Sequence, residues 1–225
     1  MRSSIFHNTE NTSQEHEKFV MQNDHMLLVN LDGEVYAKQG AMAAYQGDID
    51  FEYHGGGLSR AFKKLVTGED LSLMKCSGRG DLFLADNGSE VFTVQLENEQ
   101  LTLNNNNILA FDSSIQWDID RIRAGVMGIA AGGLFNVTLT GTGNVAVTSW
   151  GKPVVISVDQ PVAVDSNCII AWSTSLQVAI KTTLKAGMII GRSSGEAVQM
   201  LFSGQGFVIV QPGEGLIGLL MRQAS

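Results

Sequence analysis

Histidines carry the clearest capacity for acid–base chemistry or metal binding in this chain, and all four lie in its first quarter. His7, His16 and His25 are spaced nine residues apart, an interval with no helical or strand meaning. His54 stands beside Gly55-Gly56-Gly57, where it could act as a general base or a zinc ligand. An active site needs several convergent groups, and no cysteine or acidic pair joins these histidines in a metal-binding pattern. We therefore expect no catalytic residue, no metal site and no cofactor.

The glycine run also precedes a short amphipathic pattern at residues 58–66, which predicts a helix. A phosphate-binding loop of the Walker type requires Lys-Ser or Lys-Thr at its end, and Leu58-Ser59 does not supply it. We interpret the basic residues of this segment as a solvated helix face. They are Arg60, Lys63 and Lys64.

Two acidic pairs, Asp48 with Asp50 and Asp118 with Asp120, are spaced so that both carboxylates of a pair share one face of a strand. Such a pair could bind a divalent cation. Exposed strand faces in acidic proteins carry these pairs routinely, so solvated carboxylates are the favoured interpretation.

Three Gly-x-Gly motifs recur at a fixed interval, and they are the elements that must position any site. Their first glycines are equally spaced along the chain, which indicates one structural unit used three times. We interpret the glycines as structural turn residues, because glycine allows sharp turns and close strand approach. They are Gly78, Gly80, Gly141, Gly143, Gly204 and Gly206.

A second signature supports the repeat. Ala110-Phe111 and Ala171-Trp172 each begin a run of three polar residues followed by alternating apolar ones, and each run follows one of the first two glycine motifs at a similar distance. The matching run for the third motif is Ala44-Tyr45, near the other end of the chain. This predicts a third unit split between the two termini, whose meeting would close the set and remove free sheet edges. The repeated aromatics could line three equivalent pockets, but their core-like surroundings favour burial.

Short apolar runs with period-two alternation and regular turns predict an all-β fold with little helix. We expect a pseudo-threefold arrangement of antiparallel units in a single domain over residues 19–225, after a polar extension at residues 1–18. The expected repeats cover approximately residues 71–133, residues 134–196, and residues 197–225 joined with residues 19–70.

The composition excludes several classes of function. Fifteen basic residues stand against 23 acidic ones, a formal net charge of −8, so nucleic-acid binding is not expected. No apolar run reaches the ~18 residues of a membrane span, and no secretory signal core is present. A cytoplasmic protein is the default expectation. Cys76 and Cys168 show neither metal-ligand nor redox spacing and are expected to be buried thiols.

The segments that connect the units are apolar and rich in small residues. Exposed apolar surface of this kind marks a protein partner, a ligand groove or a membrane surface, although the segments could also fold back over the core. Self-association is weighed equally with core packing, and peripheral membrane contact ranks behind both. The candidate interface residues are Val126, Met127, Ile129, Met188, Ile189 and Ile190.

The runs Gly133–Val145 and Ser203–Pro212 resemble the family of altered-inheritance-of-mitochondria protein 24 and its bacterial relatives. The resemblance extends from Phe19 to Leu220 and rests on the repeat glycines and their flanking apolar pattern. It implies a pseudo-threefold β structure similar to the tryptophan RNA-binding attenuator protein, and no catalytic residues. Fungal members of the family organise the mitochondrial inner membrane, while the bacterial members have no settled activity.

These observations predict a non-enzymatic scaffold or interaction protein that forms a homo-oligomer and that could also bind an unidentified protein partner. The alternative is a module that holds a small molecule or nucleotide between its units. An enzyme that uses His54 is a third alternative and RNA binding ranks last, and fold similarity alone does not decide among them.

Overall fold

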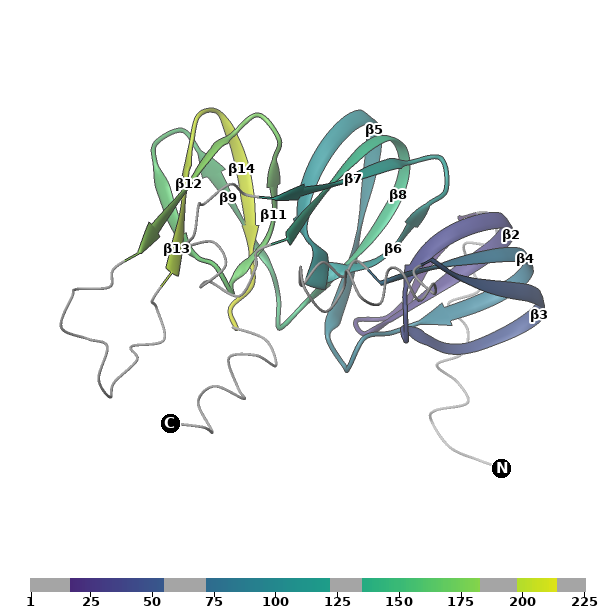
Figure 1. Ribbon diagram of the computed structural model, residues 1–225. Coiled ribbons are helices and arrows are strands. Elements are labelled where there is room, and N and C mark those ends of the chain that lie inside the picture. Colours follow the sequence, from purple (N-terminus) through teal and green to yellow (C-terminus); the bar gives the residue numbers. More distant parts are fainter. Residues whose placement is uncertain (1–16, 55–71, 122–134, 183–197, 214–225) are drawn as a thin grey trace, which may run out of the picture. The chain divides into compact units, whose positions relative to one another are not determined.

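A computed structural model describes residues 17–54, 72–121, 135–182 and 198–213, and they form an all-β fold as predicted. Eleven of the fourteen described strands belong to one antiparallel sheet and three to another. A 3₁₀ turn at Asn105–Asn107 is the one helical element within the described ranges. The predicted helix at residues 58–66 lies outside those ranges. The strands, labelled as in Figure 1, are β1 (Phe19–Asn23), β2 (Met26–Lys38), β3 (Met42–His54), β4 (Leu73–Leu84), β5 (Glu90–Asn104), β6 (Ile108–Asp112), β7 (Gln116–Arg121), β8 (Phe135–Ser149), β9 (Val154–Val158), β10 (Val162–Asp165), β11 (Ile169–Ser173), β12 (Gln177–Thr182), β13 (Val198–Ser203) and β14 (Gly206–Val210).

The first of two compact units contains the described residues up to Glu97, together with Ile108–Ile115 and Thr142–Thr148. Strand β2 is its centre, because β1, β4 and β6 all pair with it, while β3 pairs with β4 and β8 with β6. Figure 1 shows β2, β3 and β4 side by side. Alternation along β2 sends every second residue into the core on either side of an exposed stretch at residues 32–34. The buried residues of β2 are Leu27, Val29, Leu31, Val35 and Ala37.

The second unit contains Asn98–Asn107 and the described residues of Gln116–Gly141 and Ser149–Ser225. Strand β11 pairs with β5 on one side and with β14 on the other, and β9 pairs with β14. The smaller sheet has the order β10-β13-β12. A separate apolar core fills this unit, formed by Val158, Val164, Ile169, Trp172, Leu176, Met200, Phe202 and Val208.

The first two Gly-x-Gly motifs bend the strands that contain them and do not reverse the direction of the chain. Strand β4 runs unbroken through its motif, whereas the sequence predicted a turn at these glycines. The glycines have φ values of +132° and +152° there, which L side chains rarely adopt. A Cβ on Gly80 would overlap the backbone oxygen of Gln46, so glycine lets β4 lie close against β3 at the bend. The second motif lies within β8, and the third joins β13 to β14.

Each aromatic signature contacts the glycine motif that follows it in the chain. Ala44-Tyr45 lies in β3 and pairs with β4, which carries the first motif. Ala110-Phe111 pairs with β8 and Ala171-Trp172 with β14. The expected order was the reverse, with each signature following its motif and with Ala44-Tyr45 joined to the third motif. The division of the chain into three repeats, and the pseudo-threefold arrangement, stay predictions.

Candidate interaction surface

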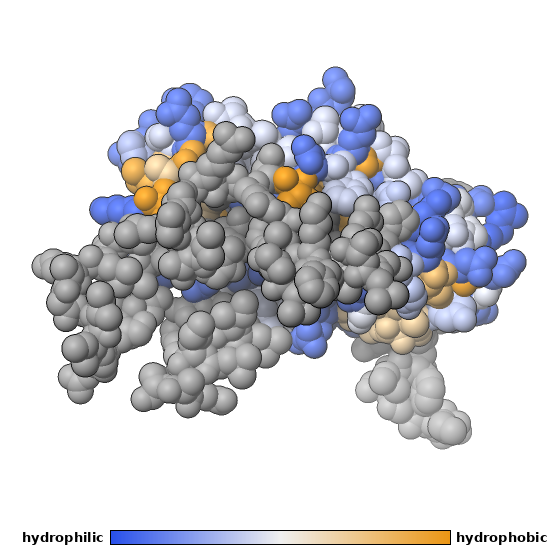
Figure 2. Space-filling model, in the orientation of Figure 1, coloured by the Kyte–Doolittle hydropathy of each residue, from blue (hydrophilic) through white to orange (hydrophobic). Residues whose placement is uncertain are grey.

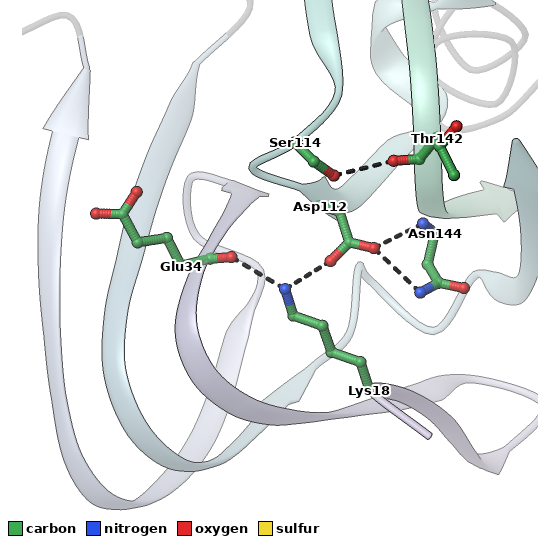
Figure 3. A network of polar contacts seen from close by, with 6 residues as sticks. All are labelled: Lys18, Glu34, Asp112, Ser114, Thr142 and Asn144. Carbon is green, nitrogen blue, oxygen red and sulfur yellow. Dashed lines mark hydrogen bonds and ion pairs between the residues drawn. The ribbon is translucent and has the colours of Figure 1, made fainter. Parts of the chain in front are cut away.

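A polar network around Asp112 is the main electrostatic feature of the first unit (Figure 3). Asp112 is the last residue of β6, and its Oδ2 accepts hydrogen bonds from the backbone N of Asn144 at 2.7 Å and from its Nδ2 at 3.1 Å. Its Oδ1 lies 2.6 Å from Nζ of Lys18, which also donates to the backbone oxygen of Glu34 at 3.1 Å. The carboxylate is nearly buried, and each oxygen has a cationic or N–H partner. This arrangement holds β6, β8 and the residue before β1 together, and it presents no reactive group.

The second unit repeats this arrangement with different chemistry. Ser173, the last residue of β11, accepts a hydrogen bond on Oγ from the backbone N of Phe207 at 3.0 Å. In the turn that follows, Ser175 Oγ donates to the backbone oxygen of Gln205, as Ser114 Oγ does to that of Thr142. The sequence predicted polar residues at these positions but not their roles. The sequence signal that could have identified Asp112 and Ser173 is their position, because each directly follows one of the repeated aromatic residues.

Carboxylates and two basic residues alternate on one face of β2, β3 and β4. Lys75 on β4 forms an ion pair with Glu34 at 2.5 Å, and Arg79 forms one with Asp32 at 2.9 Å. The hydrogen bond from Lys75 to Glu34 is the main cause that raises the pKa of Lys75, with smaller contributions from nearby negative charge. Asp48 and Asp50 are exposed on β3, and Asp118 is exposed on β7. Within the described ranges, no three metal-ligating side chains converge.

The described histidines and cysteines are spread over several strands and turns. His25 contacts the backbone oxygen of Ser89 through Nδ1 at 3.2 Å, and His54 is the last residue of β3. His7 and His16 lie outside the described residues. Cys76 is buried, and this burial raises the pKa of its thiol to about 11. Cys168 is half-buried, less enclosed than expected.

The three equivalent aromatic residues do not share one environment. Phe111 and Trp172 are buried, with exposed fractions of 0% and 3%, and they pack against Tyr36 and Phe202 with ring centroids 5.4 and 5.5 Å apart. Tyr45 is 50% exposed. Burial was expected for all three rings, and it holds for two of them. The exception arises because β3 has a described neighbour on one side only.

Large apolar side chains reach the surface on strands that have one described partner. Figure 2 shows where hydrophobic residues lie among hydrophilic ones on the face drawn. Strand β3 pairs only with β4, β7 only with β8, and β9 only with β14 among the described strands. Strand edges of this kind expose unpaired backbone N–H and C=O groups beside the apolar side chains. The exposed residues are Met42, Tyr45 and Tyr53 on β3, Trp117 on β7, and Val154 and Val155 on β9.

The candidate interface predicted from the sequence lies outside the described residues, at positions 126, 127, 129, 188, 189 and 190. The exposed strand edges were not predicted, because the expected closure of the repeats left no edge free. None of the described helices is long and apolar enough to cross a membrane.

The comparisons with known proteins agree with the observed all-β fold. A Streptococcus pyogenes protein solved by a structural genomics consortium matches with a TM-score of 0.74 and 27% sequence identity. The match covers 91% of this chain and 97% of that one. Comparison with curated proteins found no match. The family described as Mitochondrial biogenesis AIM24 matches residues 19–213. Because that match covers most of the sequence, the chain belongs to the mitochondrial biogenesis AIM24 family.

Proposed function

We propose that this protein is a non-enzymatic interaction scaffold that self-associates through its strand edges. One observation carries the proposal: all six exposed large hydrophobic side chains of the described residues lie on strands with one described partner. An edge that combines unpaired backbone groups with apolar side chains is suited to adding a further strand. Apolar surface gathered in this way marks a site of protein association.

The edges differ in what they can accept. Strand β3 carries Asp48, Asp50 and Glu52 at alternate positions, so a twofold pairing of β3 with itself centred on this stretch would place carboxylates opposite one another. Strand β9 has no charged residue, and Val154 and Val155 are more than half exposed. This symmetric pairing of β3 is therefore unfavourable, whereas β9 tolerates a copy of itself.

The experiment is light scattering coupled to size exclusion on the full chain and on Tyr45→Lys and Val155→Lys. We expect the full chain to form a defined oligomer, and at least one variant to raise the dissociation constant by about tenfold or more, because a charge at a strand edge opposes pairing. Ser77→Lys is the matched control, since Ser77 lies on β4 between Glu34 of β2 and Asp50 of β3 and so is not at a strand edge. A monomer at every concentration reached would refute the proposal.

The proposal places the scaffold in the cytoplasm and assigns it no catalytic activity. Cys76 and Cys168 do not form a disulfide, which suits a reducing compartment, and the acidic composition opposes nucleic-acid binding. Fractionation of cells that produce the full chain tests the location. Recovery of the protein in the membrane pellet after a salt wash would contradict it.

A further inference from the structure

The same strand pairing occurs once in each unit, and it buries the repeated aromatic residue both times. In the first unit β2 lies beside β6, with Tyr36 opposite Phe111. In the second unit β5 lies beside β11, with Thr102 opposite Trp172. We call β2 and β5 covering strands. The residue of a covering strand that faces the buried aromatic also precedes another of the three repeated aromatics by nine residues. Tyr36 precedes Tyr45 by this interval, and Thr102 precedes Phe111 by it.

A third strand has the position of a covering strand but covers nothing described. Ala163, the second residue of β10, precedes Trp172 by the same nine residues. On its other side β10 pairs with β13, with Ala163 opposite Leu201, just as β2 pairs with β4 with Tyr36 opposite Lys75. The separation of Lys75 and Leu201 along the chain equals that of the first and third glycine motifs. Strand β10 is thus the counterpart of β2 and β5.

Strand β3 is the complementary case. It is the counterpart of β6 and β11, each of which has neighbours on both sides, yet its own second side has no described partner. The consequence is visible in burial. Ala110, Phe111 and Ala171 are fully buried, whereas Ala44 and Tyr45 are exposed.

We propose that β3 of one chain pairs antiparallel with β10 of a second copy, with Tyr45 opposite Ala163. This inference rests on the proposed self-association and names the two surfaces that carry it. The register follows from the two observed cases, in which Tyr36 faces Phe111 and Thr102 faces Trp172. The same register places Ala44 opposite Val164 and Gln46 opposite Val162.

Charge supports this partner. Continuing the register places Asp165 opposite Ala43 and Asp48 opposite Gln160, so no like charges meet. The short apolar stretch of β10 would cover the exposed ring of Tyr45, as β2 covers Phe111. A second β3 paired symmetrically about Asp50 would bring carboxylate against carboxylate. The uncharged stretch Val162–Val164 is therefore the better complement to this edge.

A contact between two different surfaces leaves one copy of each surface free at the ends of the pair. Such heterologous association continues until it closes into a ring, or it extends as a filament. The proposal therefore predicts assemblies larger than a dimer for the unmodified chain.

The first test uses disulfide formation between two chains. Tyr45→Cys and Ala163→Cys are made separately in a Cys168→Ser background, where Cys76 stays buried, and the two chains are mixed under mild oxidation. Directly opposed residues of an antiparallel pair lie at distances that a disulfide can bridge. We expect a covalent mixed dimer. Tyr53→Cys mixed with Ala163→Cys is the matched control, because Tyr53 is also exposed on β3 but lies eight residues out of register.

The second test needs no covalent bond. Tyr45→Lys and Ala163→Lys each block one surface and leave the other intact, so each variant alone is expected to be monomeric. Mixed in equal amounts, they should form a dimer and nothing larger, because one pair of intact surfaces remains. Thermal unfolding of each variant confirms that it is folded before mixing.

The outcomes separate this inference from the proposed function. Oligomers without the mixed disulfide, or with equal cross-linking by Tyr53→Cys, overturn the β3–β10 pairing while self-association stands. A disulfide within a single monomeric chain that carries both Tyr45→Cys and Ala163→Cys also overturns it, because the two strands then meet within one molecule. A monomeric unmodified chain refutes both proposals.

Discussion

Replacing Asp112 by alanine tests whether the buried carboxylate stabilises the first unit more than a neutral group does at the matching position of the second unit. The substitution removes two hydrogen bonds from Asn144, at 2.7 and 3.1 Å, and the ion pair with Lys18. Hydrogen bonds to a charged group contribute about 1.5 kcal/mol or more each. The ion pair adds at most about 1 kcal/mol, because Lys18 is partly exposed. We expect a loss of about 3–4 kcal/mol in the free energy of unfolding.

Ser173→Ala is the matched control, since its hydroxyl accepts one hydrogen bond, from the backbone N of Phe207. Loss of a single neutral hydrogen bond costs about 1 kcal/mol. Urea unfolding of the full chain, followed by circular dichroism, measures both variants. Lys18→Met, alone and combined with Asp112→Ala, isolates the ion pair in a double-mutant cycle. Equal losses for Asp112→Ala and Ser173→Ala would refute the reasoning, because the charge would then contribute nothing beyond a neutral bond.

Further predictions concern the strand bend, the buried thiol and an unpaired amide. Gly80→Ala should destabilise the protein by more than about 3 kcal/mol or prevent folding, because its Cβ would overlap the backbone of β3. Gly33→Ala, with open space around its Cβ, should cost only the strain of a positive φ, about 1–2 kcal/mol. The midpoints of urea unfolding compare the two variants, and equal losses of stability would contradict the overlap. At pH 8 the raised pKa leaves Cys76 with about a hundredfold smaller thiolate fraction than an unperturbed thiol, so a colorimetric thiol reagent should label Cys168 first and Cys76 only on unfolding; equal rates in the native protein would be inconsistent with that burial. The raised pKa also means that this thiol favours folding up to about pH 9 and that the contribution is lost as pH rises towards 11. Asn136→Leu should leave stability unchanged or raise it, because both amide polar atoms are buried without a hydrogen-bond partner among the described residues; a loss above about 2 kcal/mol in the same urea assay would show that the amide is required.

The sequence predicted the strand-forming segments and the repeated features, but it could not assign each aromatic signature to its glycine motif. Ala110 lies almost midway between Gly78 and Gly141, so spacing alone fits either pairing. The observed ladders resolve the ambiguity, because β6 pairs with β8 and β3 with β4. The expectation of a unit split between the termini followed from choosing the other assignment.

The candidate surface was beyond sequence reasoning for a related reason. Tyr45, Phe111 and Trp172 are indistinguishable by local pattern, and only the presence or absence of a neighbouring strand decides which ring is buried. Asp112 and Ser173 were recognised as polar, but their partners come from strands that are distant in the sequence. Long-range pairing of this kind is set by the tertiary fold and leaves no periodic trace in the chain.

The difference between Asp112 and Ser173 bears on how the chain avoids misfolding. Units of similar geometry in one polypeptide can exchange strands as they fold, which traps misassembled species. If β14 docked in place of β8, Asp112 would meet Phe207, which has no side-chain donor to replace that of Asn144. A buried carboxylate with a lost partner is costly, so the exchanged product is selected against. The different polar residues at the matching positions 112 and 173 thus disfavour the exchange of strands that are otherwise similar in geometry.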